Sequence, residues 1–236
     1  MKSVFHSVQY WGDALSQLCF PRLCFGCNES PIEAAEFLCM SCLATLPYTR
    51  FEQMRNNPVE KLFWGRVKLD FAASTFYFQE ETPIQQAIHQ LKYGNQPSLG
   101  VFLGELMGNE MCGWSQKNRI DALIPMPLHP KKERTRGYNQ AALLCKGISL
   151  ATGMEIKDDV LKRVAHTATQ TRKNRNERWE NVATVFETDQ KEWLKGKNIL
   201  LVDDVITTGA STEACINTLL EAGVANANVC SLAFTL

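Results

Sequence analysis

The sequence predicts an α/β protein, in which helices flank a parallel sheet and a small metal-binding module comes first. The first observation is a continuous apolar run at 199–202 that leads into two aspartates, a turn and a helical stretch. Such a run is typical of a buried central strand. A second strand, loop and helix follow one another at 120–151, and two C-x-x-C motifs lie within 24–42. With 236 residues, the chain is long enough for one core and a small appendage.

Positive charge is distributed unevenly along the chain. The net charge is zero, but residues 117–178 contain 14 Lys and Arg and 6 Asp and Glu. This local excess predicts an anionic partner at one face of the molecule. The sequence has no convincing secretory signal and no apolar run long enough to cross a bilayer, so we expect a soluble, cytoplasmic protein without a transmembrane segment.

The N-terminal module combines a predicted helix with four cysteines. Apolar residues recur at helical spacing over 4–18 and predict a short amphipathic helix, which docks on the protein, on a partner or on a membrane surface. Eleven residues then separate two C-x-x-C pairs, which is the spacing of a closed, structural four-thiolate zinc site. Two disulfides or one redox-active pair are the alternatives, and a reducing cytoplasm disfavours both. The predicted zinc ligands are Cys24, Cys27, Cys39 and Cys42.

A polar stretch at 49–58 is interpreted as a linker or loop between this module and the larger domain. It divides the chain into an N-terminal part at 1–50 and a larger domain at 51–236. The larger domain then opens with an aromatic and β-branched run at 69–78, which predicts its first strand.

Two helices are expected after this strand. Thr82 and Pro83 are a good N-cap and first helical residue, and they predict a helix that runs to about Tyr93. Lys92 lies at the end of that helix, where a lysine is unremarkable, and a ligand role for it is the less favoured alternative. A second helix is predicted at 99–111, and three glycines at a spacing of four place a small-residue face on it for close packing: Gly100, Gly104 and Gly108.

The next unit contains most of the positive charge. A strand is predicted at 120–125 and a helix at 141–151, with a basic segment between them. The prolines and Gly137 of this segment predict a shaped loop rather than the interior of a helix. Its Lys and Arg side chains are charge-assisted donors for a phosphate-type anion, and a solvated basic loop is the alternative. The residues concerned are Lys131, Lys132, Arg134 and Arg136.

The remaining elements surround the apolar run. Residues 164–179 lack a sustained apolar face in their first half and predict a mobile loop that leads into a polar helix. Short strands are expected at 182–186 and 226–235, with a turn at Gly196 between them.

The turn after the apolar run is the strongest candidate for a ligand site. Asp203 and Asp204 end the run, and a helix is predicted from Thr212 to Ala222. Ligands of open α/β sheets bind at the carboxyl ends of strands, where backbone N–H groups and a helix N-terminus can hold a phosphate. The two aspartates would repel a phosphate, so we expect them to face sugar hydroxyls or a metal-bound group. The alternative is a plain strand, turn and helix with capping residues.

This thirteen-residue stretch at 199–211 resembles the ribose-phosphate loop of the type I phosphoribosyltransferases, which bind phosphoribosyl pyrophosphate (PRPP). The C-x-x-C pairs, the LKYGN segment at 91–95 and the PMPLHPKKERTRGYNQ segment at 125–140 occur with it in the ComF/GntX family, which the whole chain resembles. The resemblance implies a type I phosphoribosyltransferase-like sheet with a zinc-ribbon-like module in front of it. It also implies PRPP as the ligand, Mg²⁺ arriving with PRPP, and an association of some members with imported DNA in natural competence.

The resemblance also implies roles for individual residues. Asp203 and Asp204 would bind the ribose diol and are the candidate catalytic residues. The 5′-phosphate would lie in the turn formed by Thr207, Thr208, Gly209, Ala210 and Ser211. Pyrophosphate would bind Lys132, Arg134 and Arg136. The loop that closes over PRPP would supply Arg172, Lys173 and Arg175, although these residues could also contact nucleic-acid phosphates.

Two functions remain open at this point. The first is an enzyme that transfers phosphoribosyl to an unidentified acceptor, in DNA uptake or in nucleotide salvage. The second is a non-catalytic PRPP or nucleotide sensor that binds single-stranded DNA through its basic face, with proteins of the DNA-uptake machinery as partners. Aromatic residues near the basic stretch are few, so the sequence offers only weak support for a base-stacking platform.

Overall fold

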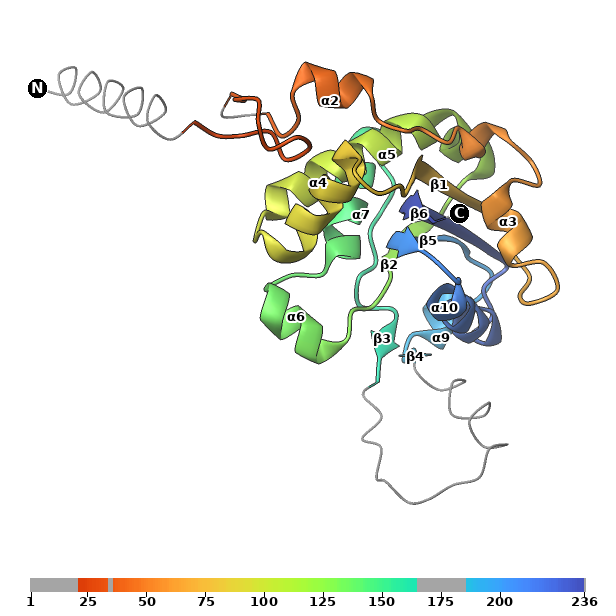
Figure 1. Ribbon diagram of the computed structural model, residues 1–236. Coiled ribbons are helices and arrows are strands. Elements are labelled where there is room, and N and C mark those ends of the chain that lie inside the picture. The colour runs from red at the N-terminus through yellow and green to blue at the C-terminus, as the bar shows by residue number, and fades with distance from the viewer. Residues whose placement is uncertain (1–20, 34–35, 165–185, 236) are drawn as a thin grey trace, which may run out of the picture.

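The computed structural model describes residues 21–33, 36–164 and 186–235. Its centre is a four-stranded sheet in the order β1-β6-β5-β2, and every neighbouring pair is parallel. The strands are β1 (Phe71–Tyr77), β2 (Ala122–Pro125), β5 (Asn198–Ile206) and β6 (Asn226–Phe234). Figure 1 shows helices on both faces of this sheet. The predicted α/β class, with a parallel sheet flanked by helices, is therefore confirmed.

The apolar run predicted to be a central strand is indeed inside the sheet. Ile199, Leu200, Leu201 and Val202 are fully buried on β5. β5 pairs with β2 on one side and with β6 on the other. A strand covered on both faces has no side that favours polar residues, which explains why this run is continuous rather than alternating.

One face of the sheet is covered by α4 (Pro83–Tyr93), α5 (Pro97–Asn118) and α7 (Gln140–Thr152). The hydroxyl of Thr82 accepts a hydrogen bond from the backbone N–H of Gln85 and caps α4 as predicted. The helix predicted at 99–111 exists and is longer, because Pro97 begins it and it runs to Asn118.

The three-glycine face of α5 packs on α7, as predicted. A Cβ atom at Gly104 would lie 2.2 Å from the backbone oxygen of Leu144. α7 contributes Gly147 to the same contact, where a Cβ atom would lie 2.0 Å from the backbone oxygen of Val101. The glycines therefore let the two backbones approach more closely than any larger residue would permit.

The stretch at 49–58, expected to be a linker or loop, instead packs along β1. It contains η1 (Phe51–Gln53) and leads into α3 (Pro58–Leu62). The N–H of Thr49 donates to the backbone oxygen of Thr75, at 2.9 Å. The side chain of Asn57 is fully buried and donates to the oxygen of Ala72, at 2.8 Å. The stretch is therefore anchored to β1 through Thr49 and the buried Asn57, while Gln53, Arg55 and Asn56 are exposed. The division of the chain near residue 50 stays a prediction.

The prediction that the basic segment is a loop was wrong, because residues 130–136 form the helix α6 (Pro130–Arg136). Pro130 occupies the first helical position, and the side chain of His129 accepts from the N–H of Lys131 at 3.2 Å. Gly137 ends the helix with a φ of +78°. Proline at the start and glycine just past the end are the ordinary boundaries of a helix.

The other face of the sheet carries α10 (Ala210–Glu221), which begins two residues earlier than predicted. Further short elements are α2 (Met40–Ala44), β3 (Lys162–Arg163), β4 (Phe186–Glu187) and α9 (Lys191–Leu194). The helix predicted at 4–18 lies outside the described residues, as does most of the loop predicted at 164–179. No helix within the described part of the chain combines the length and apolarity that crossing a membrane requires.

Candidate functional site at the carboxyl ends of the strands

The acidic pair lies where β5 extends past one of its neighbours. β2 ends at Pro125, which lies beside Val202, whereas β6 accompanies β5 as far as Ile206. Asp203 and Asp204 therefore project beyond the end of β2, and both are partly buried. Polar groups at this edge of a parallel sheet occupy the usual ligand position of open α/β folds.

Lys92 contacts this acidic pair from α4. Its Nζ lies 2.9 Å from Oδ2 of Asp204, and both side chains are mostly shielded from solvent, with exposed fractions of 23% and 18%. Lys92 and Asp204 are far apart along the chain, so no local spacing predicts this contact. The signals that point to Lys92 are its place at the end of a helix and in the LKYGN segment of the family resemblance.

Asp203 is held in an environment that disfavours its charge. The pKa of Asp203 is raised to about 8, chiefly by burial and then by the negative charge of Asp204, while the hydrogen bond from the backbone of Asp204 and the charge of Lys92 act in the opposite direction. Its Oδ1 accepts a hydrogen bond from the backbone N–H of Asp204, at 2.8 Å. The pair therefore carries less than two full negative charges near neutral pH. This reduced charge suits a ligand that presents hydroxyl groups.

The turn predicted to hold a phosphate is open at its start. Thr207, Thr208, Ala210 and Ser211 are exposed, and Gly209 takes a φ of +71° as the N-cap of α10. No side chain caps α10 within the described residues. The backbone N–H groups of its first turn therefore remain available for an anion.

Gly209 is required by packing as well as by conformation. A Cβ atom there would lie 2.8 Å from the ring of Phe63 and 3.1 Å from a methyl group of Leu62. Arg66, a few residues further on, donates to the backbone oxygen of Thr208 at 2.9 Å and to the carboxylate of Glu213. The segment after α3 therefore supports the turn, a role that the sequence did not reveal.

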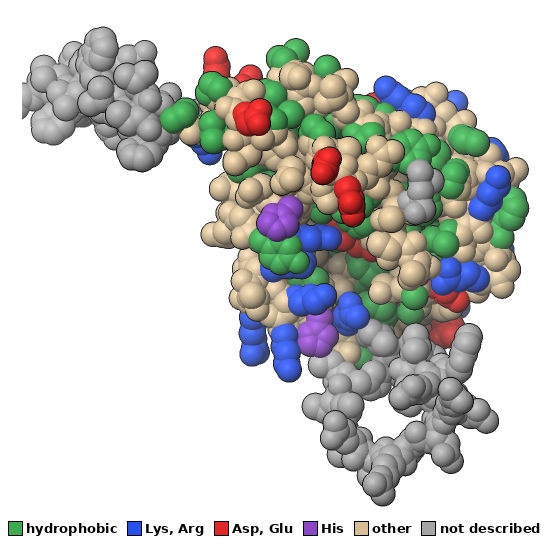
Figure 2. Space-filling view, in the orientation of Figure 1, with side chains coloured by type: hydrophobic (Ala, Val, Ile, Leu, Met, Phe, Trp, Pro, Cys, Tyr) green, Lys and Arg blue, Asp and Glu red, His purple; other side chains and the backbone are tan. Residues whose placement is uncertain are grey.

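The predicted pyrophosphate residues line a basic hollow of about 780 Å³. Figure 2 shows the Lys and Arg side chains that gather on this face around α6. The acidic pair and the turn at 207–211 do not line this hollow, but Lys92 does, and it is hydrogen-bonded to Asp204. The charged residues of the lining are Lys92, Lys131, Lys132, Arg134 and Arg136.

Arg136 is the most firmly held of these cations. Its Nη1 donates to Oε1 of Gln140 at 2.9 Å, and its guanidinium lies 5.5 Å from the centre of the Tyr93 ring. Gln140 is 2% exposed, and its Nε2 has no partner within the described residues. Tyr138, just before α7, contacts the end of α4, because its hydroxyl donates to the backbone oxygen of Leu91 at 2.7 Å. The end of α4 and the start of α7 are thus joined behind the hollow.

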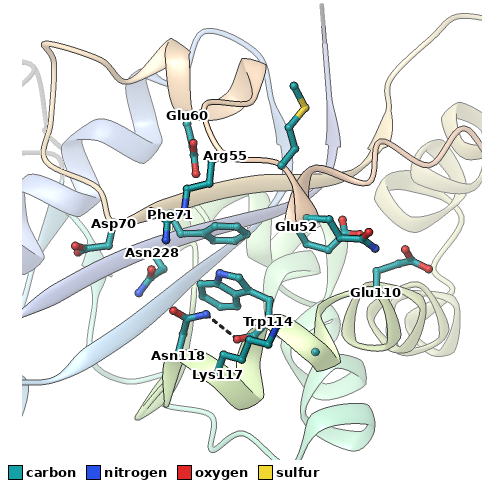
Figure 3. Close-up of a pocket in the computed structure, with 13 residues that line it drawn as sticks. Glu52, Arg55, Glu60, Asp70, Phe71, Glu110, Trp114, Lys117, Asn118 and Asn228 are labelled. Carbon is teal, nitrogen blue, oxygen red and sulfur yellow. Dashed lines mark hydrogen bonds between the residues drawn. The ribbon is translucent and has the colours of Figure 1, made fainter.

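A second hollow of about 760 Å³ lies at the opposite, amino end of the strands (Figure 3). Phe71 and Trp114 stack on each other inside it, with their ring centres 4.1 Å apart. None of the ligand residues predicted from the sequence lines it. Its charged residues are Glu52, Arg55, Glu60, Asp70, Glu110 and Lys117.

The four predicted zinc ligands come together in the N-terminal module. The sulfur atoms of Cys24, Cys27, Cys39 and Cys42 all lie within 4.8 Å of one another. A tetrahedral zinc with Zn–S bonds of about 2.3 Å places its sulfurs roughly 3.8 Å apart, so the cluster fits such an ion. All four are free thiols, and the disulfide alternative is not supported.

The surroundings favour a thiolate at Cys27 and Cys39, whose pKa values are lowered chiefly by backbone hydrogen bonds, whereas burial raises the pKa of Cys42. Sγ of Cys24 accepts from the N–H groups of Gly26 and Cys39, at 3.3 and 3.2 Å. The N–H groups of Ser30 and Glu29 lower the pKa of Cys27 to about 6. Gly26 lies between Cys24 and Cys27, where a larger residue does not fit, because a Cβ atom there would lie 2.9 Å from Sγ of Cys42.

The predicted residues of the closing loop, Arg172, Lys173 and Arg175, lie outside the described residues. Among solved structures, glutamine phosphoribosylpyrophosphate amidotransferase from B. subtilis is similar with a TM-score of 0.38 and 18% identity, over 58% of this chain and 26% of that chain. Trypanosoma cruzi hypoxanthine phosphoribosyl transferase has a TM-score of 0.39 and 10% identity, over 58% of this chain and 74% of that chain. No protein-family model matches the chain.

Sequence relatives are more informative. DNA utilization protein YhgH of Escherichia coli K12 is 28% identical over 157 residues, which are 65% of this chain and 68% of that protein. Competence protein ComFC of Bacillus subtilis is 35% identical over 110 residues, 44% of this chain and 40% of that protein. Competence protein F of Haemophilus influenzae is 30% identical over 155 residues, 64% of this chain and 68% of that protein. Similarity over that share of competence protein F shows that the chain belongs to the competence protein F-like, or ComF/GntX, family.

Proposed function

We propose that the protein binds PRPP together with Mg²⁺ and transfers its phosphoribosyl group to an acceptor, with pyrophosphate as the leaving group. One observation carries the proposal: the Lys92–Asp204 ion pair joins an acidic pair at the end of β5 to a hollow lined by cations. A ribose diol and a pyrophosphate on one molecule would match these two neighbouring regions. The process it serves would be DNA uptake in natural competence, or nucleotide salvage.

Each part of PRPP has a group to receive it in this proposal. Asp203 and Asp204 accept hydrogen bonds from the ribose hydroxyls. The backbone N–H groups at the start of α10, together with the hydroxyls of Thr207, Thr208 and Ser211, bind the 5′-phosphate. Lys132, Arg134 and Arg136 bind the pyrophosphate through charge-assisted hydrogen bonds.

The same residues would support the reaction. The bond between C1′ and the pyrophosphate oxygen breaks, and a lone pair of the acceptor forms the new bond to C1′. The pyrophosphate leaves with both bonding electrons, and the cations of α6 stabilise its growing charge. Mg²⁺ prefers oxygen ligands, and those of PRPP and the acidic pair are of that kind. The loop that carries Arg172, Lys173 and Arg175 would exclude water from the activated ribose.

The most informative experiment offers PRPP and Mg²⁺ to the protein with a panel of nucleobases and amines and measures pyrophosphate release. Release that depends on one acceptor is the expected result. The matched control is the double variant Asp203→Asn/Asp204→Asn, which keeps the shape of both side chains and should release none. Calorimetry that detects no PRPP binding by well-folded protein would refute the proposal.

A second candidate function is a non-catalytic sensor of PRPP or nucleotides that binds single-stranded DNA. The names of the relatives, which refer to DNA utilization and competence, favour it, as does the concentration of cations on α6. Binding that neutralises several DNA phosphates weakens steeply as salt is added. Tight PRPP binding without turnover, together with salt-dependent DNA binding, would support this function, and proteins of the DNA-uptake machinery would then be its partners.

We further propose that the four-cysteine cluster binds one structural Zn²⁺ per chain. Four protein ligands complete the tetrahedron, so no position is left for a substrate. Metal analysis of protein purified without oxygen should find about one zinc per chain. Cys112→Ser, outside the cluster, is the control for Cys24→Ser. Absence of metal from the unaltered protein would disprove the assignment.

A further inference from the structure

Lys92 belongs to both halves of the candidate site. Its ammonium forms the ion pair with Asp204, at 2.9 Å, and its side chain also lines the basic hollow with the cations of α6. An anion in that hollow would therefore compete with Asp204 for the same ammonium. The two halves cannot be filled independently if they share this cation.

The backbone around Lys92 is well fixed, so a change of partner would fall to its side chain. The hydroxyl of Tyr138 bonds to the oxygen of Leu91, at 2.7 Å, and the N–H of Gly94 bonds to the oxygen of Gln90, at 2.7 Å. These contacts hold the end of α4 against the start of α7. A lysine ammonium on its flexible four-carbon stem can change partners by rotation alone. The exchange therefore needs no movement of the helix.

We propose that Lys92 is an exchangeable counter-ion, which makes the site select ligands that carry a ribose and a diphosphate in one molecule. In the free protein it neutralises Asp204 and occupies the carboxylate. A diphosphate in the basic hollow draws the ammonium away, and the released carboxylate accepts hydrogen bonds from the ribose diol. This inference rests on the proposed binding of PRPP and adds a positioning residue that the family resemblance did not assign.

Such an exchange predicts positive coupling between two small ligands. Pyrophosphate should occupy the basic hollow and ribose 5-phosphate the acidic pair and turn. Because pyrophosphate releases Asp204, it should tighten the binding of ribose 5-phosphate, and the coupling is reciprocal by thermodynamic necessity. We expect saturating pyrophosphate to raise the affinity for ribose 5-phosphate about fivefold or more. A fivefold change is at the lower end of typical coupling between two sites.

The test compares calorimetric titrations of ribose 5-phosphate with and without saturating pyrophosphate. Lys92→Met should abolish the coupling, so that the ratio of the two affinities approaches one, whereas Lys92→Arg should restore part of it. Lys131→Met is the matched control, because Lys131 lines the same hollow and does not form the ion pair with Asp204. This variant should weaken the binding of pyrophosphate and preserve the coupling. Lys117→Met removes a lysine from the amino-end hollow and should change neither quantity.

The outcomes separate the two proposals. Unaltered protein that binds neither PRPP nor ribose 5-phosphate would overturn the proposed function, and this inference with it. If unaltered protein binds PRPP and Lys92→Met keeps the full coupling, the role of Lys92 is overturned and the proposed function stands. Equal loss of coupling in Lys92→Met and Lys131→Met would also overturn it, because general charge removal would then explain the effect. Circular dichroism of each variant checks that the fold is retained.

Discussion

The two ends of the central sheet carry hollows of nearly equal size and different chemistry. The carboxyl-end hollow, of about 780 Å³, has five Lys and Arg residues in its lining and no carboxylate. The amino-end hollow, of about 760 Å³, contains four carboxylates, two cations and the stacked rings of Phe71 and Trp114. Size therefore does not distinguish the two sites. Charge does, and it assigns an anionic ligand to the carboxyl end.

The direction of the strands and helices explains the difference. α7 and α10 start near the carboxyl end, whereas α5 finishes near the start of β2. Helix N-termini favour anions. The backbone at the start of α10 therefore favours the same kind of ligand as the cations of the carboxyl-end hollow. Two helices, α4 and α6, finish at this hollow, and the cations of their last turns line it.

The largest expected effect comes from removing two cations at the carboxyl end. Lys132→Ala/Arg134→Ala should weaken PRPP binding about 100-fold, since each charge-assisted hydrogen bond contributes about 1.5–3 kcal/mol. Both side chains are exposed, so the fold should survive. Arg55→Ala/Lys117→Ala removes two cations from the amino end as a control. Equal weakening by both double variants, measured by calorimetry, would show that the charge difference does not direct binding.

A smaller effect is expected at the acidic pair and the turn. Asp204→Asn or Thr208→Val should weaken PRPP binding about tenfold. Asp204→Asn changes a hydrogen-bonding group at the ribose position, and Thr208→Val removes one at the 5′-phosphate position. Asp70→Asn neutralises a carboxylate of the amino-end hollow and serves as the comparison. Unchanged PRPP affinity in Asp204→Asn would contradict the assignment of ribose to this end of the sheet.

Features encoded by neighbouring residues were predicted well from the sequence. The apolar run became the central strand, Thr82 caps its helix, and the cysteine spacing brings four sulfurs together. Local patterns suffice there because each depends on burial or on a turn a few residues long. Pro130 shows the limit of this reasoning: the prolines of its segment predict a loop, although proline is equally suited to the first position of a helix.

The features that the sequence missed are contacts between distant segments. Lys92 reaches Asp204, and Arg66 supports the turn at Thr208. The amino-end hollow likewise draws its lining from residues spread between 52 and 228. No local pattern distinguishes such residues from ordinary surface charges. Their roles depend on the sheet order, which one sequence alone did not provide.

The pH dependence of PRPP binding should sharpen the comparison further. The pKa of Asp203 is raised to about 8, so its carboxylate forms mainly as the pH rises from about 7 to 9. PRPP affinity should increase a few-fold over this range, because the ionised carboxylate is the better acceptor for the ribose hydroxyls. PRPP itself titrates in this range and affects both proteins equally. The ratio of the PRPP affinities of unaltered protein and Asp203→Asn therefore cancels that contribution. A ratio that does not change with pH would disprove the role of Asp203.

The same raised pKa has a consequence for stability. The folded protein holds the Asp203 proton over a pH range in which the unfolded chain, with an ordinary value near 3.8, has lost it. The contribution of this group to the free energy of unfolding is therefore greatest at acidic pH and falls as the pH rises from about 4 to 8. Denaturant titrations of unaltered protein and Asp203→Asn should diverge in this direction. Asp70→Asn should show no comparable trend.

The smallest effect on binding is expected from the aromatic pair at the amino end. Trp114→Leu removes the stacking with Phe71, which is worth about 0.5–1.5 kcal/mol beyond the buried area. We therefore expect the free energy of unfolding to fall by about 1 kcal/mol, while PRPP affinity changes less than about twofold. Phe71 begins β1 and lies beside Asn228 on β6, so a large loss of PRPP affinity would mean that the two ends communicate through these strands. An unchanged affinity together with lower stability would assign the aromatic pair to the core of the fold and leave ligand binding to the carboxyl end.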